Sequence, residues 1–504
     1  MLFAISLLVV SLHAFAEGTL TYALPSTIPN LDPGFSAGTP AQGVRKLIWE
    51  TLVDRDEEGR IVPLLAQSWE VSEDGLRWTF HLRTGIKFHN GDYLKSEDVK
   101  ASLERVIDPK YGLPRRATLA PIKEVEIIDE YTVVVVTRYP FSPLLYHLSM
   151  DVAAIMSKVA LDTYGYEMHQ IGWHPVGTGP YKYDSHIPEE RIVLVRFEEY
   201  WGPRPYFDKI VFRFIPEAAT RLLLLETGVV DIVEMVPPHE VSRLKATPGI
   251  KVLQVPGNRV AHLGLNCQRA PFDNPKVRQA LQFAIDKEAL VKGLLYGAGS
   301  PADSIVAPGV FGYHSVGFYT YNPERAKTLL AEAGYATGLE FEIWTPSGRY
   351  FQDKETVEAI QAMLAEIGIQ ANVKVFDWTT YLSVLRKPLT ENVSQAYFLG
   401  WEVGTDDIAY LLDLVFTSTA WPPAGWNTMF YKNEEVDSLI EQGKAELDPD
   451  VRRQIYARLQ ELVMNDSPWI PLYVYDQIFA MRADIEGFWA WPSGTVILHN
   501  VSKK

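Results

Sequence analysis

Hydrophobic and polar residues alternate between positions 66 and 83, and this period of two predicts a β-hairpin. Trp69 and Val71 alternate with polar neighbours before Asp74-Gly75, a pair that favours a tight turn. The apolar positions of the returning strand are Trp78, Phe80 and Leu82. One face of the hairpin is therefore expected to be buried, and the other to meet water.

Other stretches have the period of an α-helix. Residues 44–53 place apolar side chains near helical spacing, and Ser96 is a candidate N-cap for a helix that starts at Glu97. Asn274-Pro275 and Asn322-Pro323 each combine an N-cap with a proline at the first helical position. A long helix is also expected over residues 450–464.

In the second half of the chain, predicted strands and helices alternate as they do in α/β proteins. Residues 339–344 read as a strand, 353–367 as a helix closed by Gly368, and 369–376 as another strand. Such a β-α-β unit implies parallel strands with a right-handed crossover. The first half instead contains β-branched runs, as in residues 123–137, and is expected to include a β-rich section.

Size and charge narrow the range of functions. At 504 residues the chain exceeds one hydrophobic core, and two to four domains are expected. The net charge of −16 lacks the basic excess that nucleic-acid binding requires, so no nucleic-acid partner is expected. The 13 tryptophans fit either large cores or a cleft walled by aromatic rings.

The N-terminus predicts export. An apolar run over residues 2–10 precedes Ala14-Phe15-Ala16, a cleavage pattern, so residues 1–16 are expected to be a signal peptide, although no Lys or Arg precedes Arg45. The run is too short to span a membrane. Cys267 is the single cysteine, which excludes a disulfide within the chain and leaves no cysteine for a lipid anchor near the cleavage site. We therefore expect a periplasmic protein without a lipid anchor.

Catalytic signatures are absent from the sequence. It contains no G-x-S-x-G elbow, phosphate-binding loop, dinucleotide fingerprint or H-E-x-x-H motif. The eleven histidines are scattered, and His169 and His174 lack a third ligand at metal spacing. We expect no catalytic residues, no metal site and no cofactor.

Several longer motifs resemble one family. They are the block over residues 62–99 (VPLLAQSWEVSEDGLRWTFHLRTGIKFHNGDYLKSEDV), PVGTGPYKY at 175–183, Tyr200-Trp201-Gly202, Ala270-Pro271-Phe272, VRQA at 277–280 and Tyr321-Asn322-Pro323. In this order they resemble the extracellular solute-binding proteins of the peptide/nickel (dipeptide/oligopeptide-binding) family, the receptors of ABC importers. The resemblance covers essentially the whole chain after the signal.

The resemblance implies an α/β, two-lobed periplasmic-binding-protein-like fold (type II, cluster C) with an extra inserted β-rich domain. The lobes would close on a ligand by a hinge motion. The expected boundaries are signal peptide 1–16, lobe I 17–50, 173–258 and 475–504, inserted domain 51–172, and α/β lobe III 259–474.

The candidate ligand site is the segment over residues 397–407, an apolar strand followed by a loop that exposes Trp401, Glu402 and Asp406. Ligands of open α/β sheets lie beyond the strand ends, where this loop is expected. Peptide receptors of the family place an Asp three residues after the Trp, and here that position is Gly404. Glu402 or Asp406 could replace it.

Arg349 is a candidate anchor for a ligand carboxylate through a two-pronged hydrogen bond, although a structural salt bridge with Asp353 or Glu355 is an equal alternative. Trp378 and Trp426 could wall the cleft or lie in the core, and Asn30 and Asp32 line it by resemblance. The full candidate set is Asn30, Asp32, Arg349, Tyr350, Trp378, Trp401, Glu402, Gly404, Asp406 and Trp426.

Together these observations predict a monomeric receptor that captures a peptide or similar small polar solute and presents it to an inner-membrane ABC permease. One alternative keeps the fold and binds an oligosaccharide or an opine. A third class is an envelope chaperone or signalling receptor, or a carboxylate-based hydrolase that uses Glu402 and Asp406.

Overall fold

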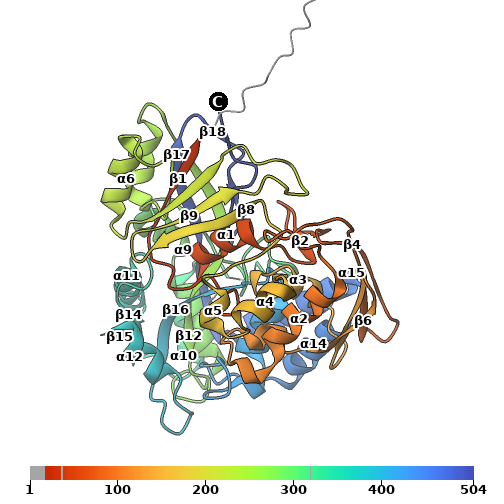
Figure 1. Ribbon diagram of the computed structural model, residues 1–504. Coiled ribbons are helices and arrows are strands. Elements are labelled where there is room, and N and C mark those ends of the chain that lie inside the picture. Colours follow the sequence, from red (N-terminus) through yellow and green to blue (C-terminus); the bar gives the residue numbers. More distant parts are fainter. Residues whose placement is uncertain (1–17, 36–37, 318) are drawn as a thin grey trace, which may run out of the picture.

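The computed structural model describes residues 18–35, 38–317 and 319–504, and the structural statements below refer to these ranges. The predicted signal peptide, residues 1–16, lies outside them. Figure 1 shows three groups of elements. Strands β1, β8 and β9 lie in the upper part, β14, β15 and β16 at the lower left, and α2, α3 and α4 at the lower right.

One mixed sheet of eleven strands dominates the described part of the chain, in the order β15-β14-β16-β12-β17-β11-β1-β10-β9-β8, with β13 paired to β17. Its strands are β1 (Thr19–Leu24), β8 (Tyr181–Ile187), β9 (Arg191–Arg196), β10 (Lys209–Phe214), β11 (Ile232–Glu234), β12 (Ile250–Leu265), β13 (Gly299–Pro301), β14 (Leu339–Pro346), β15 (Ile369–Phe376), β16 (Ala396–Glu402) and β17 (Trp469–Arg482). The expected α/β fold is confirmed.

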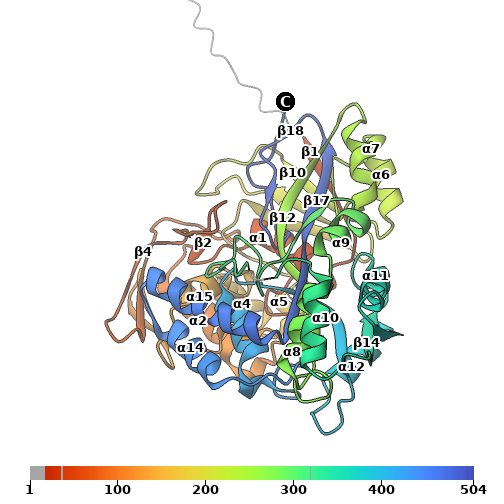
Figure 2. The ribbon, with the colours of Figure 1, turned by 180° about the vertical axis from the view of Figure 1, so that it is seen from behind.

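The two central strands, β12 and β17, run from the upper to the lower part of the molecule (Figure 2). They pair antiparallel over most of their length, but the register shifts between Pro256 and Val260. This irregularity lies beside the expected boundary between lobe I and lobe III at residues 258–259. A β-bulge at this register shift bends the two strands locally. A hinge between two lobes would require such a bend. The lobe boundaries themselves remain a prediction.

A separate four-stranded antiparallel sheet, in the order β4-β5-β7-β6, lies within the expected inserted domain. Its strands are β4 (Ala66–Val71), β5 (Arg77–Leu82), β6 (Ile122–Asp129) and β7 (Thr132–Thr137). The hairpin is confirmed, and Trp78, Phe80 and Leu82 are buried as expected. Val71 is 39% exposed instead of buried, because β4 is an edge strand with one neighbour.

Helices cover the sheets at most of the expected places. They are α1 (Thr39–Ile48), α2 (Ser96–Ile107), α3 (Leu144–Leu148), α4 (Lys158–Tyr164), α5 (Met168–Ile171), α6 (Ala218–Glu226), α7 (Val241–Lys245), α8 (Pro275–Ala284), α9 (Lys287–Leu294), α10 (Pro323–Glu332), α11 (Asp353–Ala365), α12 (Trp378–Leu385), α13 (Ile408–Leu411), α14 (Glu434–Ala445) and α15 (Pro449–Asp466). The shorter turns are the 3-10 helices Pro109–Tyr111, Arg116–Leu119, Asp151–Ala153, Pro238–Glu240 and Ser418–Ala420, and the π-turn Leu412–Phe416. The small ladders are β2 (Val53–Arg55) with β3 (Ile61–Pro63), β18 (Ile485–Glu486) with β21 (Ser502–Lys503), and β19 (Trp489–Ala490) with β20 (Val496–Ile497).

The helix starts at Asn274-Pro275 and Asn322-Pro323 are confirmed, and each Asn side chain accepts a backbone N–H of the first turn. Two starts differ from expectation. The helix expected over residues 44–53 begins at Thr39 and ends at Ile48, since Trp49 is already extended. Ser96 is the first helical residue rather than the N-cap, because the Asp98 carboxylate accepts the N–H of Lys95 at 2.8 Å.

The expected β-α-β unit is also confirmed. Strands β14 and β15 are parallel neighbours over their full length, and α11 connects them. Helix α11 packs Val357, Ile360 and Leu364 against the sheet, where they are fully buried. This packing fixes the loop between β14 and α11, which carries Arg349, at the carboxyl end of the strands.

The side chain of Glu50, which follows α1, connects two of the sequence motifs that lie far apart in the chain, PVGTGPYKY at 175–183 and Tyr200-Trp201-Gly202. Its carboxylate is buried and accepts hydrogen bonds from Thr178 Oγ1 at 2.7 Å, Tyr200 OH at 2.9 Å and Trp201 Nε1 at 2.8 Å. Burial raises the pKa of Glu50 to about 7, against the opposing effect of these three donors. The carboxyl group therefore takes up a proton on folding at mildly acidic pH.

We expect this proton uptake to make stability fall as pH rises from about 5 to about 7. In that window the folded state binds more protons at Glu50 than the unfolded state, so the free energy of unfolding decreases with pH, by roughly 1 to 3 kcal/mol in total. Thermal unfolding measured from pH 5 to 8 should show that Glu50→Gln has a weaker pH dependence than the parent. Glu57→Gln, at an exposed carboxylate, serves as the control. Parallel curves for the parent and Glu50→Gln would contradict the shifted pKa.

Candidate functional site

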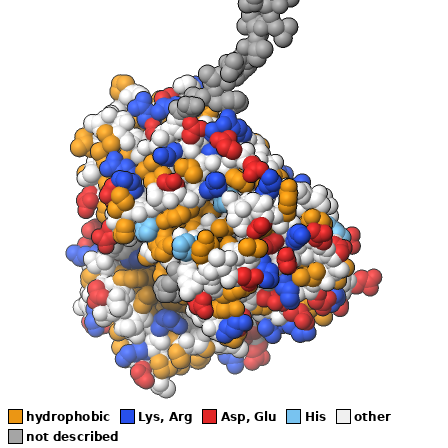
Figure 3. Space-filling view, viewed as in Figure 1, with side chains coloured by type: hydrophobic (Ala, Val, Ile, Leu, Met, Phe, Trp, Pro, Cys, Tyr) orange, Lys and Arg blue, Asp and Glu red, His pale blue; other side chains and the backbone are white. Residues whose placement is uncertain are grey.

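A cavity of about 200 Å³ lies at the carboxyl end of β16, beside the loop that leads into α11. Its lining residues are Arg349, Tyr350, Trp378, Leu382, Leu399, Gly400, Trp401, Glu402 and Trp426. Six of the ten candidate residues are among them. Figure 3 shows the molecular surface from the side of Figure 1, with a hollow at the lower left.

Strand β16 brings the site to the rim of the sheet. It pairs antiparallel with β12, and this register places Glu402 opposite Arg259 and Gly400 opposite Ala261. The strand is buried from Ala396 to Leu399 and becomes partly exposed from Gly400 onward. The cavity therefore begins where the strand leaves the core, as expected for a ligand site of an open α/β sheet.

The loop that carries Arg349 is held by Asp353, the first residue of α11. The Asp353 carboxylate accepts backbone N–H groups from Gly348 at 3.2 Å, Arg349 at 2.8 Å and Tyr350 at 3.0 Å. Sequence reasoning left open a salt bridge between Arg349 and Asp353 or Glu355. Asp353 instead contacts the backbone of the loop, and this arrangement leaves the guanidinium group available.

The Arg349 guanidinium group lies over two aromatic rings, at 4.8 Å from the ring centre of Trp378 and 5.6 Å from that of Tyr350. Within the described ranges it has no ion-pair partner or side-chain hydrogen bond. Stacking on rings favours a guanidinium group by a cation–π attraction and restricts its orientation. Arg349 is thus an exposed cation with a fixed position and free donors.

Glu402 forms an ion pair with Arg259, with 2.5 Å between Oε2 and Nη2. Burial raises the pKa of the Glu402 carboxyl above its usual value, while the guanidinium of Arg259 opposes the shift. Arg259 also lies 5.9 Å from the ring centre of Tyr350. The pair is therefore neutral overall and part of the cavity wall.

Aromatic rings form much of the remaining wall. Trp401 and Trp426 meet edge to face, with ring centres 5.7 Å apart and an interplanar angle of 66°. Tyr350 OH donates to the carbonyl of Gly400 at 3.2 Å, which joins the loop to the end of β16. Flat apolar surfaces with one fixed cation are typical of pockets for small organic solutes.

Asp406 and Gly404 do not line this cavity. Asp406 is 5% exposed and forms an ion pair with Arg55, while its second oxygen accepts Asn258 Nδ2 at 2.6 Å. Burial raises the pKa of the Asp406 carboxyl, and Arg55 opposes the shift. Gly404, the position at which the family resemblance predicts an Asp, lies in the same loop.

Asn30 and Asp32 also lie away from the cavity. They are 3% and 0% exposed, and Asp32 forms an ion pair with Arg105 of α2. The Asn30 side chain accepts the N–H of Asp32 at 2.7 Å. These two residues therefore belong to a buried junction between the N-terminal segment and the expected inserted domain.

Sequence reasoning missed Arg259, Gly400 and the two leucines of the wall. Arg259 is recognisable only once the register of β12 and β16 is known, because 143 residues separate it from Glu402. Leu382 could have been found from the helical spacing that places it one turn after Trp378 on α12.

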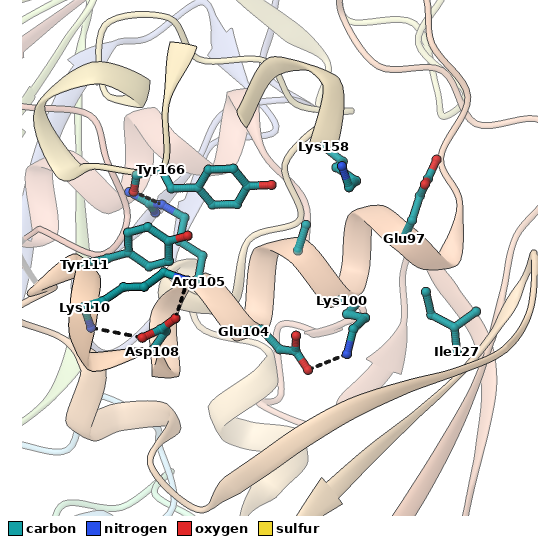
Figure 4. Close-up of a pocket in the computed structure, with 11 residues that line it drawn as sticks. Glu97, Lys100, Glu104, Arg105, Asp108, Lys110, Tyr111, Ile127, Lys158 and Tyr166 are labelled. Carbon is teal, nitrogen blue, oxygen red and sulfur yellow. Dashed lines mark hydrogen bonds and ion pairs between the residues drawn. The ribbon is translucent and has the colours of Figure 1, made fainter. Parts of the chain in front are cut away.

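A second hollow, of about 440 Å³, lies between α2, α4 and the turn Pro109–Tyr111 (Figure 4). The rings of Tyr111 and Tyr166 stack there, with centres 5.4 Å apart. Its lysines already have carboxylate partners, as in Lys100 with Glu104 at 2.6 Å and Lys110 with Asp108 at 2.7 Å. No lysine of this hollow offers the free charge that Arg349 offers, so the smaller cavity is the candidate site.

Metal binding and thiol catalysis find little support in the part of the chain that the structure describes. No group of three or more His, Cys, Asp or Glu side chains is placed there to hold a metal ion. Burial raises the pKa of Cys267 to about 11, which disfavours the reactive thiolate. Among the described helices, none is long and apolar enough to cross a membrane.

The chain is similar to known proteins in sequence and in fold. Residues 60–423 match the family model of bacterial extracellular solute-binding proteins, family 5. The glutathione-binding protein GsiB of Escherichia coli O1:K1 is 34% identical over 481 residues, which are 95% of this chain and 93% of GsiB.

Two solved structures extend the likeness to the fold. HbpA2 of Haemophilus parasuis has a TM-score of 0.88 and 28% identity, and the match covers 97% of this chain and 100% of HbpA2. The periplasmic binding protein DppA of Helicobacter pylori, solved with the peptide STSA, has a TM-score of 0.78 and 30% identity, over 96% of this chain and 98% of DppA.

Proposed function

This chain belongs to family 5 of the bacterial extracellular solute-binding proteins, and from that premise we propose that it captures a di- or oligopeptide and delivers it to an inner-membrane ABC permease. The relatives are solute-binding proteins, and two of them are described with glutathione and with a peptide as ligand. The observation that carries the proposal is the cavity at the end of β16, where the free guanidinium of Arg349 faces aromatic walls.

In this function Arg349 binds a carboxylate of the peptide. Two parallel N–H donors fit the two oxygens of a carboxylate, and the rings of Trp378 and Tyr350 hold the guanidinium plane in place. The rings of Trp401 and Trp426 supply apolar contact area for side chains without selecting one sequence. Closure of the lobes excludes water and strengthens each of these contacts.

We further propose that the protein works as a monomer in the periplasm, after removal of residues 1–16. An opine is a second candidate ligand, because it also carries a carboxylate for Arg349. A neutral oligosaccharide would leave that guanidinium without a partner in the closed cleft, which is unfavourable.

The test is isothermal titration with di- to pentapeptides, glutathione, opines and neutral oligosaccharides. We expect peptides to bind and Arg349→Gln to weaken that binding by roughly 10- to 100-fold, since a charge-assisted hydrogen bond is lost. Lys354→Gln is the matched control, because it removes a charge from the same region at a side chain that pairs with Glu358. Absence of peptide binding to the parent, or equal loss in both variants, would contradict the proposal.

A further inference from the structure

The cavity at the end of β16 carries more positive than negative charge. Of its lining residues, only Arg349 and Glu402 carry a charged side chain. The guanidinium of Arg349 forms no ion pair within the described ranges. Glu402, the acid of the wall, interacts with it electrostatically but is hydrogen-bonded to Arg259. The site therefore has an excess of positive charge before a ligand enters, and Arg386, 4.4 Å from the ring centre of Trp426, adds to it.

A peptide with two free ends brings both a carboxylate and an ammonium group. The carboxylate has an obvious partner in Arg349. For the ammonium group the neighbouring acids are Glu402 and Asp406, which the sequence suggested as replacements for the missing Asp at position 404. Both are already neutralised, by Arg259 and by Arg55.

Asp406 is also out of reach in this structure. Its side chain is 6% exposed, one oxygen meets Arg55, and the other accepts Asn258 Nδ2 at 2.6 Å. Gly404 has no side chain to contribute. Only Glu402 remains in the cavity wall, and its Oε2 is bonded to Arg259 Nη2.

The remaining oxygen of Glu402 can still accept a hydrogen bond from a ligand. Because Arg259 already neutralises the carboxylate, an ammonium group gains little more there than a neutral amide N–H does. The amino end of the peptide would then bind through shape complementarity and neutral hydrogen bonds. Its carboxyl end would bind through the charge of Arg349.

We propose that the cleft selects its ligand as an anion, so that a free carboxylate is required and a free α-amino group is not. The ligand class then includes N-acylated peptides together with ordinary free peptides. This inference rests on the proposed function.

The experiment compares four forms of one dipeptide by titration: free, N-acetylated, C-terminally amidated, and blocked at both ends. We expect the N-acetylated form to bind within about 3-fold of the free form, and the amidated form to bind roughly 10- to 100-fold more weakly. The doubly blocked form should be as weak as the amidated one. Arg349→Gln should abolish the difference between the carboxylate and amide forms.

A second variant tests the role assigned to Arg259. Arg259→Gln leaves Glu402 without its neutralising partner, so at pH 8 the variant should prefer the free over the N-acetylated peptide by roughly 10-fold. Lys354→Gln should keep the parental preference.

The outcomes separate this inference from the proposed function. If none of the four forms binds while the protein is folded, peptide capture itself is wrong and the inference falls with it. If free peptide binds but acetylation abolishes binding in the parent, capture stands and the inference is overturned. Equal affinity for the carboxylate and the amide would also overturn it.

Discussion

Replacing Asp151 with alanine is expected to lower the free energy of unfolding by about 3 to 5 kcal/mol, because it removes the buried carboxylate that two buried guanidinium groups share. Asp151 Oδ2 accepts Arg45 Nη1 at 3.0 Å and Oδ1 accepts Arg115 Nη1 at 2.7 Å. All three side chains are nearly inaccessible, with exposures of 0% for Arg45, 6% for Arg115 and 3% for Asp151.

The pKa of Asp151 supports this assignment. Burial alone would raise it, but the two guanidinium groups outweigh burial and hold the pKa below its usual value. Arg45 belongs to α1, while Arg115 and Asp151 lie in the expected inserted domain. The cluster therefore joins that domain to the N-terminal segment, and its loss should loosen the junction as well as the core.

Urea unfolding of the parent and Asp151→Ala measures the effect. The control is Glu126→Ala, which breaks the exposed ion pair with Arg77 in the same region and should change stability little. A loss in Asp151→Ala no larger than that of the control would show that the two arginines find other partners.

The sequence predicts well those helices and strands whose pattern lies within one short segment of the chain. Period-two alternation identified the hairpin of β4 and β5, and Asn-Pro pairs identified the starts of α8 and α10. The start of α1 had a signal as well, in the proline that follows Thr39, but the apolar spacing after Val44 drew the prediction five residues too far along the chain.

The candidate site was predictable only in part, for a physical reason. Trp401 and Glu402 follow an apolar strand, and that pattern is visible in one segment. The pairing of Glu402 with Arg259 depends on the register of two strands that are distant in the chain, and the pairing of Asp406 with Arg55 spans 351 positions. No local pattern encodes such contacts, although they decide which carboxylate faces a ligand.

The ion pair between Arg55 of β2 and Asp406 leads to the second large effect. Both side chains are buried, and Arg55 also lies 4.6 Å from the ring centre of Trp491. Asn258, at the register shift of β12, donates to the other oxygen of Asp406 and to the carbonyl of Val403 at 3.0 Å. These contacts thus link β2, the register shift of β12 and the loop that follows β16.

Because the expected division places Arg55 in the inserted domain and Asp406 in lobe III, the pair should stabilise the arrangement of these domains in this structure, which we expect to be the closed state. Asp406→Asn keeps the shape and suits the positive φ of 57° at this position, but it leaves Arg55 buried without a counter-charge. We expect the closed state to lose about 3 kcal/mol and the peptide affinity to fall by roughly 100-fold. Small-angle scattering should show a larger radius of gyration in the presence of the peptide.

A matched variant separates closure from general stability. Asp407 forms an equally buried pair with Arg452 at 2.7 Å, but both residues lie in the expected lobe III. Asp407→Asn should therefore lower the melting temperature to a similar degree with little change in affinity. The double variant Arg55→Met/Asp406→Asn should recover part of the affinity, since an apolar side chain removes the unpaired charge. If Asp406→Asn and Asp407→Asn weaken binding equally, the pair stabilises the fold without governing closure.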